Sequence, residues 1–109
     1  MRIKEVIEQS IELKTQLLND DCLIEEIEKV KTIMVKAFKE GKKVLWCGNG
    51  GSAADAQHLA AEFSGRFYYD RDPLKSEALH VNTSYLTAVA NDYSYDVIYS
   101  RLVKAMGEE

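Results

Sequence analysis

The first forty residues carry apolar side chains at every third or fourth position, the period of a helix with one apolar face. This period predicts one helix over residues 2–18 and a second over about 22–40. The polar run Asn19-Asp20-Asp21 interrupts the pattern and supplies an N-cap for the second helix, which Gly41 is suited to end. The apolar stripes are Ile3, Val6, Ile7, Ile11 and Leu17 or Leu18 in the first helix, and Leu23, Ile27, Val30, Met34 and Phe38 in the second.

Beyond residue 41, short apolar runs alternate with helical stretches. The run Val44-Leu45-Trp46-Cys47 lies between two lysines and a glycine cluster, as expected of a buried strand in a parallel sheet. Strands are predicted over 43–47 and 77–81, and helices over 53–64, from a cap at Thr83 or Ser84 through Val89, and over 95–106 with Gly107 after it. Strands alternating with helices indicate an α/β fold with a parallel sheet.

Two strands are too few for a parallel sheet that helices cover on both faces. We therefore expect residues 1–109 to form a single incomplete domain. In it, residues 1–40 are the N-terminal helical pair and residues 41–109 are the first part of an α/β sheet unit.

Charge and composition narrow the class of protein. The 14 Lys+Arg and 18 Asp+Glu residues give a formal net charge of −4, which argues against a nucleic-acid binder. No apolar run reaches the roughly 18 residues that a membrane span needs, and the charged N-terminus is unlike a signal peptide. Cys22 and Cys47 are too few for a disulfide scaffold, so we expect buried free thiols. These features predict a cytoplasmic protein without nucleic-acid or membrane partners.

The segment Cys47-Gly48-Asn49-Gly50-Gly51-Ser52 joins the first predicted strand to a helix. Glycines allow a tight turn that exposes backbone N–H groups, and the positive end of the helix dipole follows, so the segment suits an anion such as phosphate. A tight turn without a ligand is the alternative. A dinucleotide-binding loop is disfavoured because no acidic residue ends the second predicted strand, and no Gly-Lys-Ser/Thr completes a P-loop.

His58 and Glu62 are four residues apart on the helix that follows, so they share one face. An imidazole and a carboxylate at this spacing can bind zinc or serve as acid and base, although two ligands do not complete a zinc site. A solvated helix pair is the alternative. Asn91-Asp92 suits either a helix C-terminal turn or a contact with a sugar hydroxyl. Tyr93, Tyr95 and Tyr99 are expected to be core or interface aromatics.

Three segments resemble the bacterial phosphoheptose isomerases of the sugar-isomerase (SIS) superfamily. They are Gly48-Asn-Gly-Gly-Ser-Ala-Ala-Asp-Ala-Gln-His58-Leu-Ala-Ala-Glu62, Ser64-Gly65-Arg66-Phe67 and Asn82-Thr-Ser-Tyr-Leu-Thr-Ala-Val-Ala-Asn91-Asp92-Tyr93. The resemblance implies a three-layer fold with a parallel sheet flanked by helices, and a homotetramer with active sites between subunits. It implies conversion of sedoheptulose 7-phosphate to glycero-manno-heptose 7-phosphate, the first step toward the heptose of surface polysaccharides, and it implies bound zinc.

The resemblance also implies roles for particular residues. Glu62 would be the catalytic carboxylate that moves a proton between C1 and C2 through an enediol, and His58 and Glu62 would be two zinc ligands. The remaining residues would contact the sugar phosphate. These are Asn49, Gly50, Gly51 and Ser52 in the glycine-rich segment, together with Arg66 and Asp92.

The sequence departs from the family pattern in one large way. The second serine/threonine-rich phosphate loop and the later helix with a glutamine and a histidine do not occur before Glu109, so we expect the 109-residue span alone to be inactive. Asn82 stands where many members have Asp, and Arg71-Asp72-Pro73 replaces the usual Arg-Pro segment. Both differences are expected to alter sugar preference.

Two non-catalytic functions remain as alternatives. One is a SIS-fold protein that binds the bacterial replication initiator, and the other is a domain that senses a phosphosugar without chemistry. The presence of Glu62 and Gly51 favours the enzyme, because the initiator-binding relative lacks the carboxylate.

Overall fold

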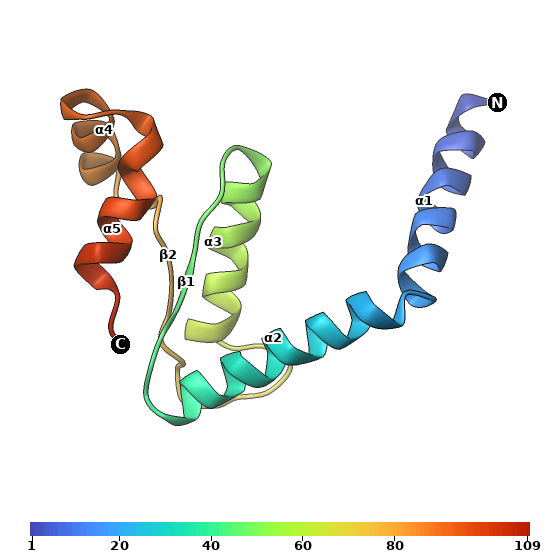
Figure 1. The fold of residues 1–109 in the computed structure, drawn as a ribbon, viewed down its shortest axis with the longest axis horizontal. Coiled ribbons are helices and arrows are strands. Elements are labelled where there is room, and N and C mark those ends of the chain that lie inside the picture. The colour runs from blue at the N-terminus through green and yellow to red at the C-terminus, as the bar shows by residue number, and fades with distance from the viewer. The chain divides into compact units, whose positions relative to one another are not determined.

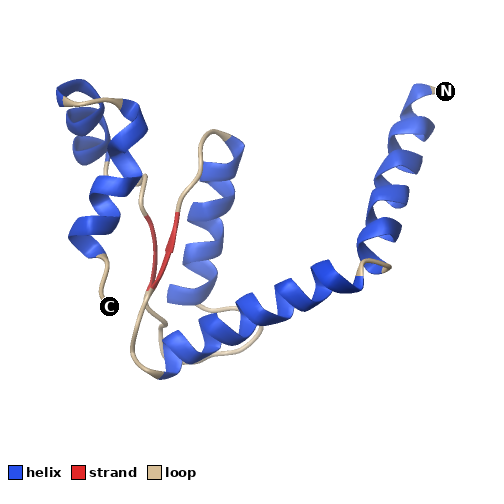
Figure 2. Ribbon diagram, viewed as in Figure 1, coloured by secondary structure: helices blue, strands red, loops and turns tan.

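The computed structural model describes residues 1–109, which form two compact units, Met1–Lys36 and Ala37–Glu109. The elements in chain order are α1 (Arg2–Leu18), α2 (Asp21–Lys39), β1 (Val44–Trp46), α3 (Gly51–Ser64), β2 (Ser76–Ala78), α4 (Thr83–Asp92), the 3₁₀ turn η1 (Tyr95–Val97) and α5 (Ile98–Met106) (Figure 1). Figure 2 shows the predicted alternation of helices and strands after α2. The α/β prediction is therefore confirmed.

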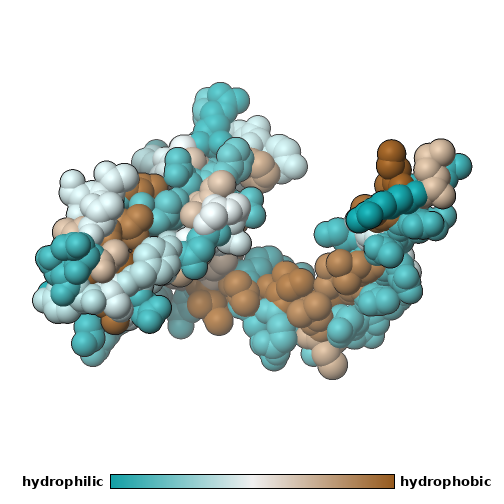
Figure 3. Space-filling model, turned by 90° about the horizontal axis from the view of Figure 1, so that it is seen from above, coloured by the Kyte–Doolittle hydropathy of each residue, from teal (hydrophilic) through white to brown (hydrophobic).

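The first unit consists of α1 and most of α2, and neither helix contains a buried residue. Asp20 caps α2 as predicted, since its Oδ1 accepts a hydrogen bond from the backbone N–H of Leu23 at 3.0 Å. Apolar side chains are exposed along both helices, and they form brown patches in Figure 3. None of the helices combines the length and the hydropathy of a membrane span.

The predicted end of α2 is also confirmed. Gly41 has φ = +72°, a conformation that costs glycine little and most other residues more. The backbone N–H of Lys42 donates to the carbonyl of Ala37 at 2.8 Å, which closes the last turn. The chain then enters β1 directly.

In the second unit, β1 and β2 pair in parallel, with Val44, Leu45 and Trp46 opposite Ser76, Glu77 and Ala78. The intervening α3 packs on one side of the two strands, and α4 and α5 lie on the other side (Figure 1). Ala56, Ala60 and Ala78 are almost fully buried. These small side chains allow α3 to approach the strands closely.

Aromatic rings anchor the base of this unit. The ring of Phe63 on α3 lies 5.3 Å from Phe38 and 5.9 Å from Trp46, measured between ring centroids. The indole N–H of Trp46 donates to Ser76 Oγ at 2.8 Å, which joins the two strands through side chains. The end of α2, the strands and α3 therefore share one aromatic cluster.

Several predicted boundaries are wrong by a few residues. β2 ends at Ala78 rather than residue 81, because Leu79 and His80 turn the chain toward α4. Asn82, rather than Thr83 or Ser84, caps α4, since its Oδ1 accepts from the backbone N–H of Tyr85 at 2.9 Å. The helix predicted from residue 53 begins at Gly51, the one predicted to end at Val89 continues to Asp92, and the one predicted from 95 opens as a 3₁₀ turn.

Both cysteines differ from expectation, because Cys22 and Cys47 are exposed free thiols in this chain. Cys22 lies in the first turn of α2, whose side chains are all at least partly accessible, and Cys47 is the first residue after β1. Neither position lies inside the core formed by α3 and the strands.

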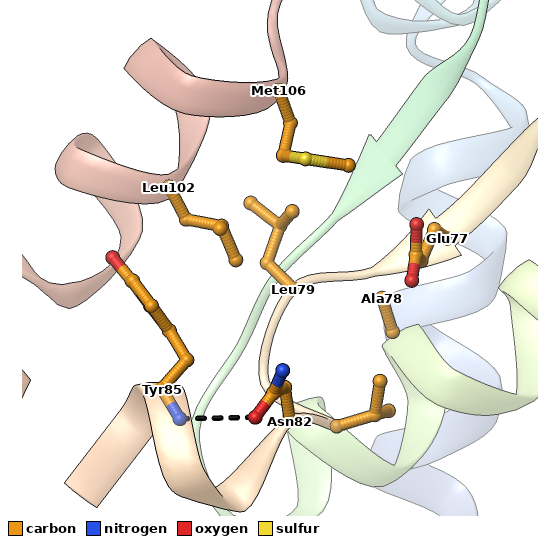
Figure 4. A pocket seen from close by; sticks show the side chains of 8 residues that line it. Glu77, Ala78, Leu79, Asn82, Tyr85, Leu102 and Met106 are labelled. Carbon is orange, nitrogen blue, oxygen red and sulfur yellow. Dashed lines mark hydrogen bonds between the residues drawn. The ribbon is translucent and has the colours of Figure 1, made fainter. Parts of the chain in front are cut away.

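A cavity of about 160 Å³ lies between β2, α4 and α5 (Figure 4). Its lining includes the apolar side chains of Leu79, Leu102 and Met106, together with Asn82 and Tyr85. None of the predicted site residues lines it.

Candidate functional site

The glycine-rich loop from Cys47 to Ser52 leads from the end of β1 into the first turn of α3 (Figure 1). A Cβ atom on Gly48 would lie 2.7 Å from the backbone C and O atoms of Ser52, so no side chain fits there. Gly50 is the residue before α3 and has φ = +58° and ψ = −123°, a backbone conformation that glycine adopts at little cost. The two glycines explain why this sequence turns so tightly.

The turn leaves several backbone donors available. The N–H of Ser52 donates to Asn49 O at 3.0 Å, and the N–H of Ala54 donates to Gly50 O at 3.2 Å. The N–H groups of Asn49, Gly50 and Gly51 have no acceptor within the chain. Free N–H groups at the positive end of a helix suit an anion.

Two tyrosines contact the glycine-rich loop from the other side of the sheet. The hydroxyl of Tyr95, in η1, donates to Asn49 Oδ1, and the hydroxyl of Tyr99, in α5, donates to Gly48 O at 2.5 Å. Burial raises the pKa of Tyr99 above its ordinary value. Neither contact was predicted from the sequence. The first contact spans 46 positions of the sequence and the second spans 51. The only local signal was that Tyr95 and Tyr99 share a helical face.

His58 and Glu62 meet on α3, with His58 Nε2 3.0 Å from Glu62 Oε1. They lie on the face opposite Ala56 and Ala60, the residues buried against the sheet. His58 has 78% of its side chain exposed, whereas Glu62 has 29% exposed. The pair therefore presents a partly shielded carboxylate and an accessible imidazole.

Arg71 shields the end of α3 that carries Glu62. Its guanidinium donates to the backbone carbonyl of Glu62 through Nη2 and to that of Phe63 through Nη1, both at 2.8 Å. These carbonyls belong to the last turn of the helix, where intrahelical partners run out. The sequence predicted no role of this kind for Arg71, because nothing local shows that its side chain returns to α3.

Arg66 and Asp92 make no hydrogen bond or ion pair with the glycine-rich loop in this chain. Arg66 follows the C-terminal end of α3, about 20 Å along the helix from Gly51, and it pairs with Asp70 at 3.4 Å. Asp92 is the exposed last residue of α4, where Asn91 Nδ2 donates to its Oδ1 at 3.4 Å. Locally, Asn91-Asp92 is thus a helix C-terminal turn.

His58 and Glu62 are the two metal-binding donors that the chain brings together. The structure contains no group of three or more His, Cys, Asp and Glu side chains that could hold a metal ion. An imidazole nitrogen and a carboxylate oxygen fit two positions of a tetrahedral zinc site. His80, the other histidine, lies in the turn after β2 with its Nδ1 buried and without a hydrogen-bond partner.

Residues 6–108 match the model of the SIS domain, so the chain belongs to the SIS domain family. Its relatives include phosphoheptose isomerases. The protein from Clostridium acetobutylicum is 53% identical over 107 residues, which cover 98% of this chain and 55% of that protein. The protein from Mycobacterium tuberculosis is 48% identical over 101 residues, which cover 93% of this chain and 52% of that protein. The family resemblance predicted from the motifs is confirmed.

Solved structures agree with this assignment. The phosphoheptose isomerase of Francisella tularensis superposes with a TM-score of 0.91 at 35% identity, over 99% of this chain and 56% of that one. The enzyme from Neisseria gonorrhoeae gives 0.86 at 38% identity, over 98% of this chain and 54% of that one. The predicted SIS-type fold is confirmed, and the chain spans about half the length of the relatives it matches.

Proposed function

We propose that this chain acts in a phosphoheptose isomerase that converts sedoheptulose 7-phosphate to D-glycero-D-manno-heptose 7-phosphate. One observation supports the chemistry above the others. A partly shielded carboxylate, Glu62, contacts His58 on the same helix that begins at a glycine-rich anion loop. The chain that carries this arrangement is 53% identical in sequence to a phosphoheptose isomerase over 107 residues.

Glu62 acts as the proton carrier in this proposal. Its carboxylate removes a proton from C1 of the ketose, which gives an enediol, and the proton is then delivered to C2 to give the aldose. The substrate and product are isomers, so no oxidant or reductant is consumed. In this structure His58 lies against the carboxylate, with its Nε2 3.0 Å from Glu62 Oε1.

The glycine-rich loop binds the phosphate and nearby sugar oxygens. The free N–H groups of Asn49, Gly50 and Gly51 and the hydroxyl of Ser52 are the donors. A phosphate held here fixes one end of the substrate, and Glu62 acts further along α3 on the other end. Arg66 and Asp92 contact the substrate in the assembled enzyme, as the family resemblance implies.

We also propose one zinc ion per site, bound in part by His58 Nε2 and Glu62 Oε1. The chemistry of this donor pair fits zinc, and the further ligands come from outside this pair. When bound, zinc supplies Lewis-acid polarisation of the substrate's carbonyl oxygen.

The active enzyme is proposed to be a homotetramer. The exposed apolar stripes of α1 and α2 suit burial against other copies of the chain, and the His58–Glu62 pair on the outer face of α3 is accessible to groups from a neighbouring subunit. The proposed setting is the cytoplasm, where the product supplies heptose for surface polysaccharide such as lipopolysaccharide.

The test measures isomerisation of sedoheptulose 7-phosphate by the longest natural form of the gene product. The Glu62→Gln variant is expected to lose at least about a hundredfold in kcat, since the amide cannot carry the proton. Metal analysis of the same preparations checks zinc, which the variant should hold more weakly because it lacks a charged ligand.

The matched control is Glu25→Gln, which removes a carboxylate from the polar face of α2 and is expected to keep wild-type turnover. A folded natural form without turnover contradicts the isomerase and favours a phosphosugar sensor or a partner-binding protein. Full turnover in Glu62→Gln leaves the isomerase standing and removes Glu62 as its proton carrier.

A further inference from the structure

We propose that Tyr95 and Tyr99 are positioning residues that aim the two donors of Asn49, its backbone N–H and its side-chain Nδ2, at the bound phosphosugar. This inference rests on the proposed function of the glycine-rich loop and extends it to residues outside the loop. Both hydroxyls donate to oxygen atoms that flank the Asn49 donors.

Tyr95 acts on the side chain of Asn49. A carboxamide has one acceptor oxygen and one donor nitrogen, which point in different directions. The hydroxyl of Tyr95 donates to Oδ1 and so fixes which end of the amide faces the protein. Nδ2 is left facing away, where it can donate to an oxygen of a ligand. Asn49 therefore recognises acceptor atoms, such as phosphate or carbonyl oxygens.

Tyr99 acts on the backbone of the same residue. In a trans peptide the C=O of one residue and the N–H of the next point in opposite directions. The Tyr99 hydroxyl holds Gly48 O at 2.5 Å, and this aims the Asn49 N–H away from α5. That N–H is one of the three free donors in the loop.

The segment that carries the two tyrosines is anchored in the core. Ile98, which lies between η1 and the rest of α5, is the most buried side chain of the protein. A fixed support for flexible donors lowers the cost of ordering them when a ligand binds.

The experiment compares Tyr95→Phe and Tyr99→Phe in the longest natural form of the protein. The readouts are calorimetric affinity for inorganic phosphate and the KM and kcat for sedoheptulose 7-phosphate. Each variant is expected to weaken phosphate affinity and raise KM by about three- to tenfold, the size of one hydrogen bond, with a smaller change in kcat.

Tyr85→Phe is the matched control. It removes a hydroxyl-to-carbonyl hydrogen bond of the same length from the same packing, but that bond does not reach the glycine-rich loop. Its thermal stability is expected to fall as in the other two variants, while its phosphate affinity and KM stay unchanged. Equal affinity losses in all three variants mean general destabilisation and overturn the proposal.

A double-mutant cycle separates the two tyrosines. In an Asn49→Ala background, Tyr95→Phe is expected to have no further effect, because it acts through the missing side chain. Tyr99→Phe is expected to keep its effect there, because it acts through the backbone. Additive losses for Tyr95→Phe contradict its role.

The same measurements distinguish this proposal from the isomerase itself. If the wild type binds phosphate without turnover, and the tyrosine variants bind it more weakly, the isomerase fails and the positioning role stands. If turnover occurs and the variants match the wild type in KM and phosphate affinity, the positioning role fails. A wild type that binds no phosphate overturns it as well.

Discussion

Gly48 and Gly51 both lie in the glycine-rich loop and the start of α3, but the space around their Cα atoms differs. Gly48 lies against the backbone of Ser52, whereas a Cβ on Gly51 would meet nothing within 4 Å. Gly51 is also the first residue of α3, where its own backbone is helical. The same substitution at the two positions therefore has opposite expected effects on stability.

Gly48→Ala is expected to lower the free energy of unfolding by about 1–3 kcal/mol, because the new methyl group forces the loop away from α3. Gly51→Ala is expected to raise it by up to about 1 kcal/mol, because alanine restricts the unfolded chain and favours the helix. Urea unfolding of both variants measures the difference. A Gly48→Ala protein as stable as the wild type would show that the loop relaxes freely.

At the scale of elements, side chains from outside α3 hold both of its ends. Tyr99 holds the loop before its first turn, and Arg71 holds the carbonyls of its last turn. Glu62 lies on α3 at the end that Arg71 contacts. The C-terminal end of α3 therefore depends on a side chain that comes from the loop leading to β2.

Arg71→Gln is expected to destabilise the protein by about 1–3 kcal/mol, since it removes two charge-assisted hydrogen bonds to backbone carbonyls. Amide exchange should accelerate in the last turn of α3, including the Gly65 N–H that donates to Ala61 O.

The control for this prediction is Arg101→Gln, which removes an exposed guanidinium from the ring of Tyr93. Arg101→Gln is expected to lower the free energy of unfolding by less than Arg71→Gln does, and to leave amide exchange in α3 unchanged. Unaltered exchange in Arg71→Gln would contradict its role as a cap.

The elements that were predicted well are those specified by local pattern. α1 and α2 have long apolar periods, and α2 is bounded by Asp20 at its start and Gly41 after its end, residues that favour helix boundaries by their own chemistry. The end of β2 was predicted less well, because Leu79 and Val81 continue an apolar run while the chain already turns. Asn82, Thr83 and Ser84 are all good caps, so only the geometry after the turn selects Asn82.

The candidate site shows the same division. The glycine-rich loop and the His58–Glu62 pair follow from spacing along the chain, and the structure places the pair in contact. The roles proposed for these residues in binding and catalysis stay predictions. The support from Tyr95, Tyr99 and Arg71 was not predictable, because each contact joins segments whose approach depends on how the sheet and helices pack.

At the scale of the whole molecule, the unit Met1–Lys36 has no buried side chains of its own. Its apolar stripe on α1 is exposed at Ile3, Val6, Ile7 and Ile11. A stripe of this kind is stable in water when another surface covers it. A second copy of the chain is the partner proposed for it.

Ile7→Asp combined with Ile11→Asp is therefore expected to convert the proposed tetramer of the longest natural form into smaller species. Charged carboxylates in a buried apolar interface cost several kcal/mol. Sedimentation velocity measures the change in mass. Gln9→Asp with Gln16→Asp adds the same charge to the polar face of α1 and should leave the mass unchanged. Identical masses for both double variants would show that this stripe does not hold the assembly together.

The aromatic residues are distributed unevenly between the two units. Residues 1–36 contain no phenylalanine, tyrosine or tryptophan, and the single tryptophan, Trp46, is stacked on Phe63 beside Ser76. Fluorescence and near-ultraviolet circular dichroism thus come entirely from Ala37–Glu109, whereas far-ultraviolet dichroism reports the helices of both units. The unit Ala37–Glu109 therefore has optical signals of its own, and a melting experiment with both signals distinguishes sequential from concerted unfolding without any added dye.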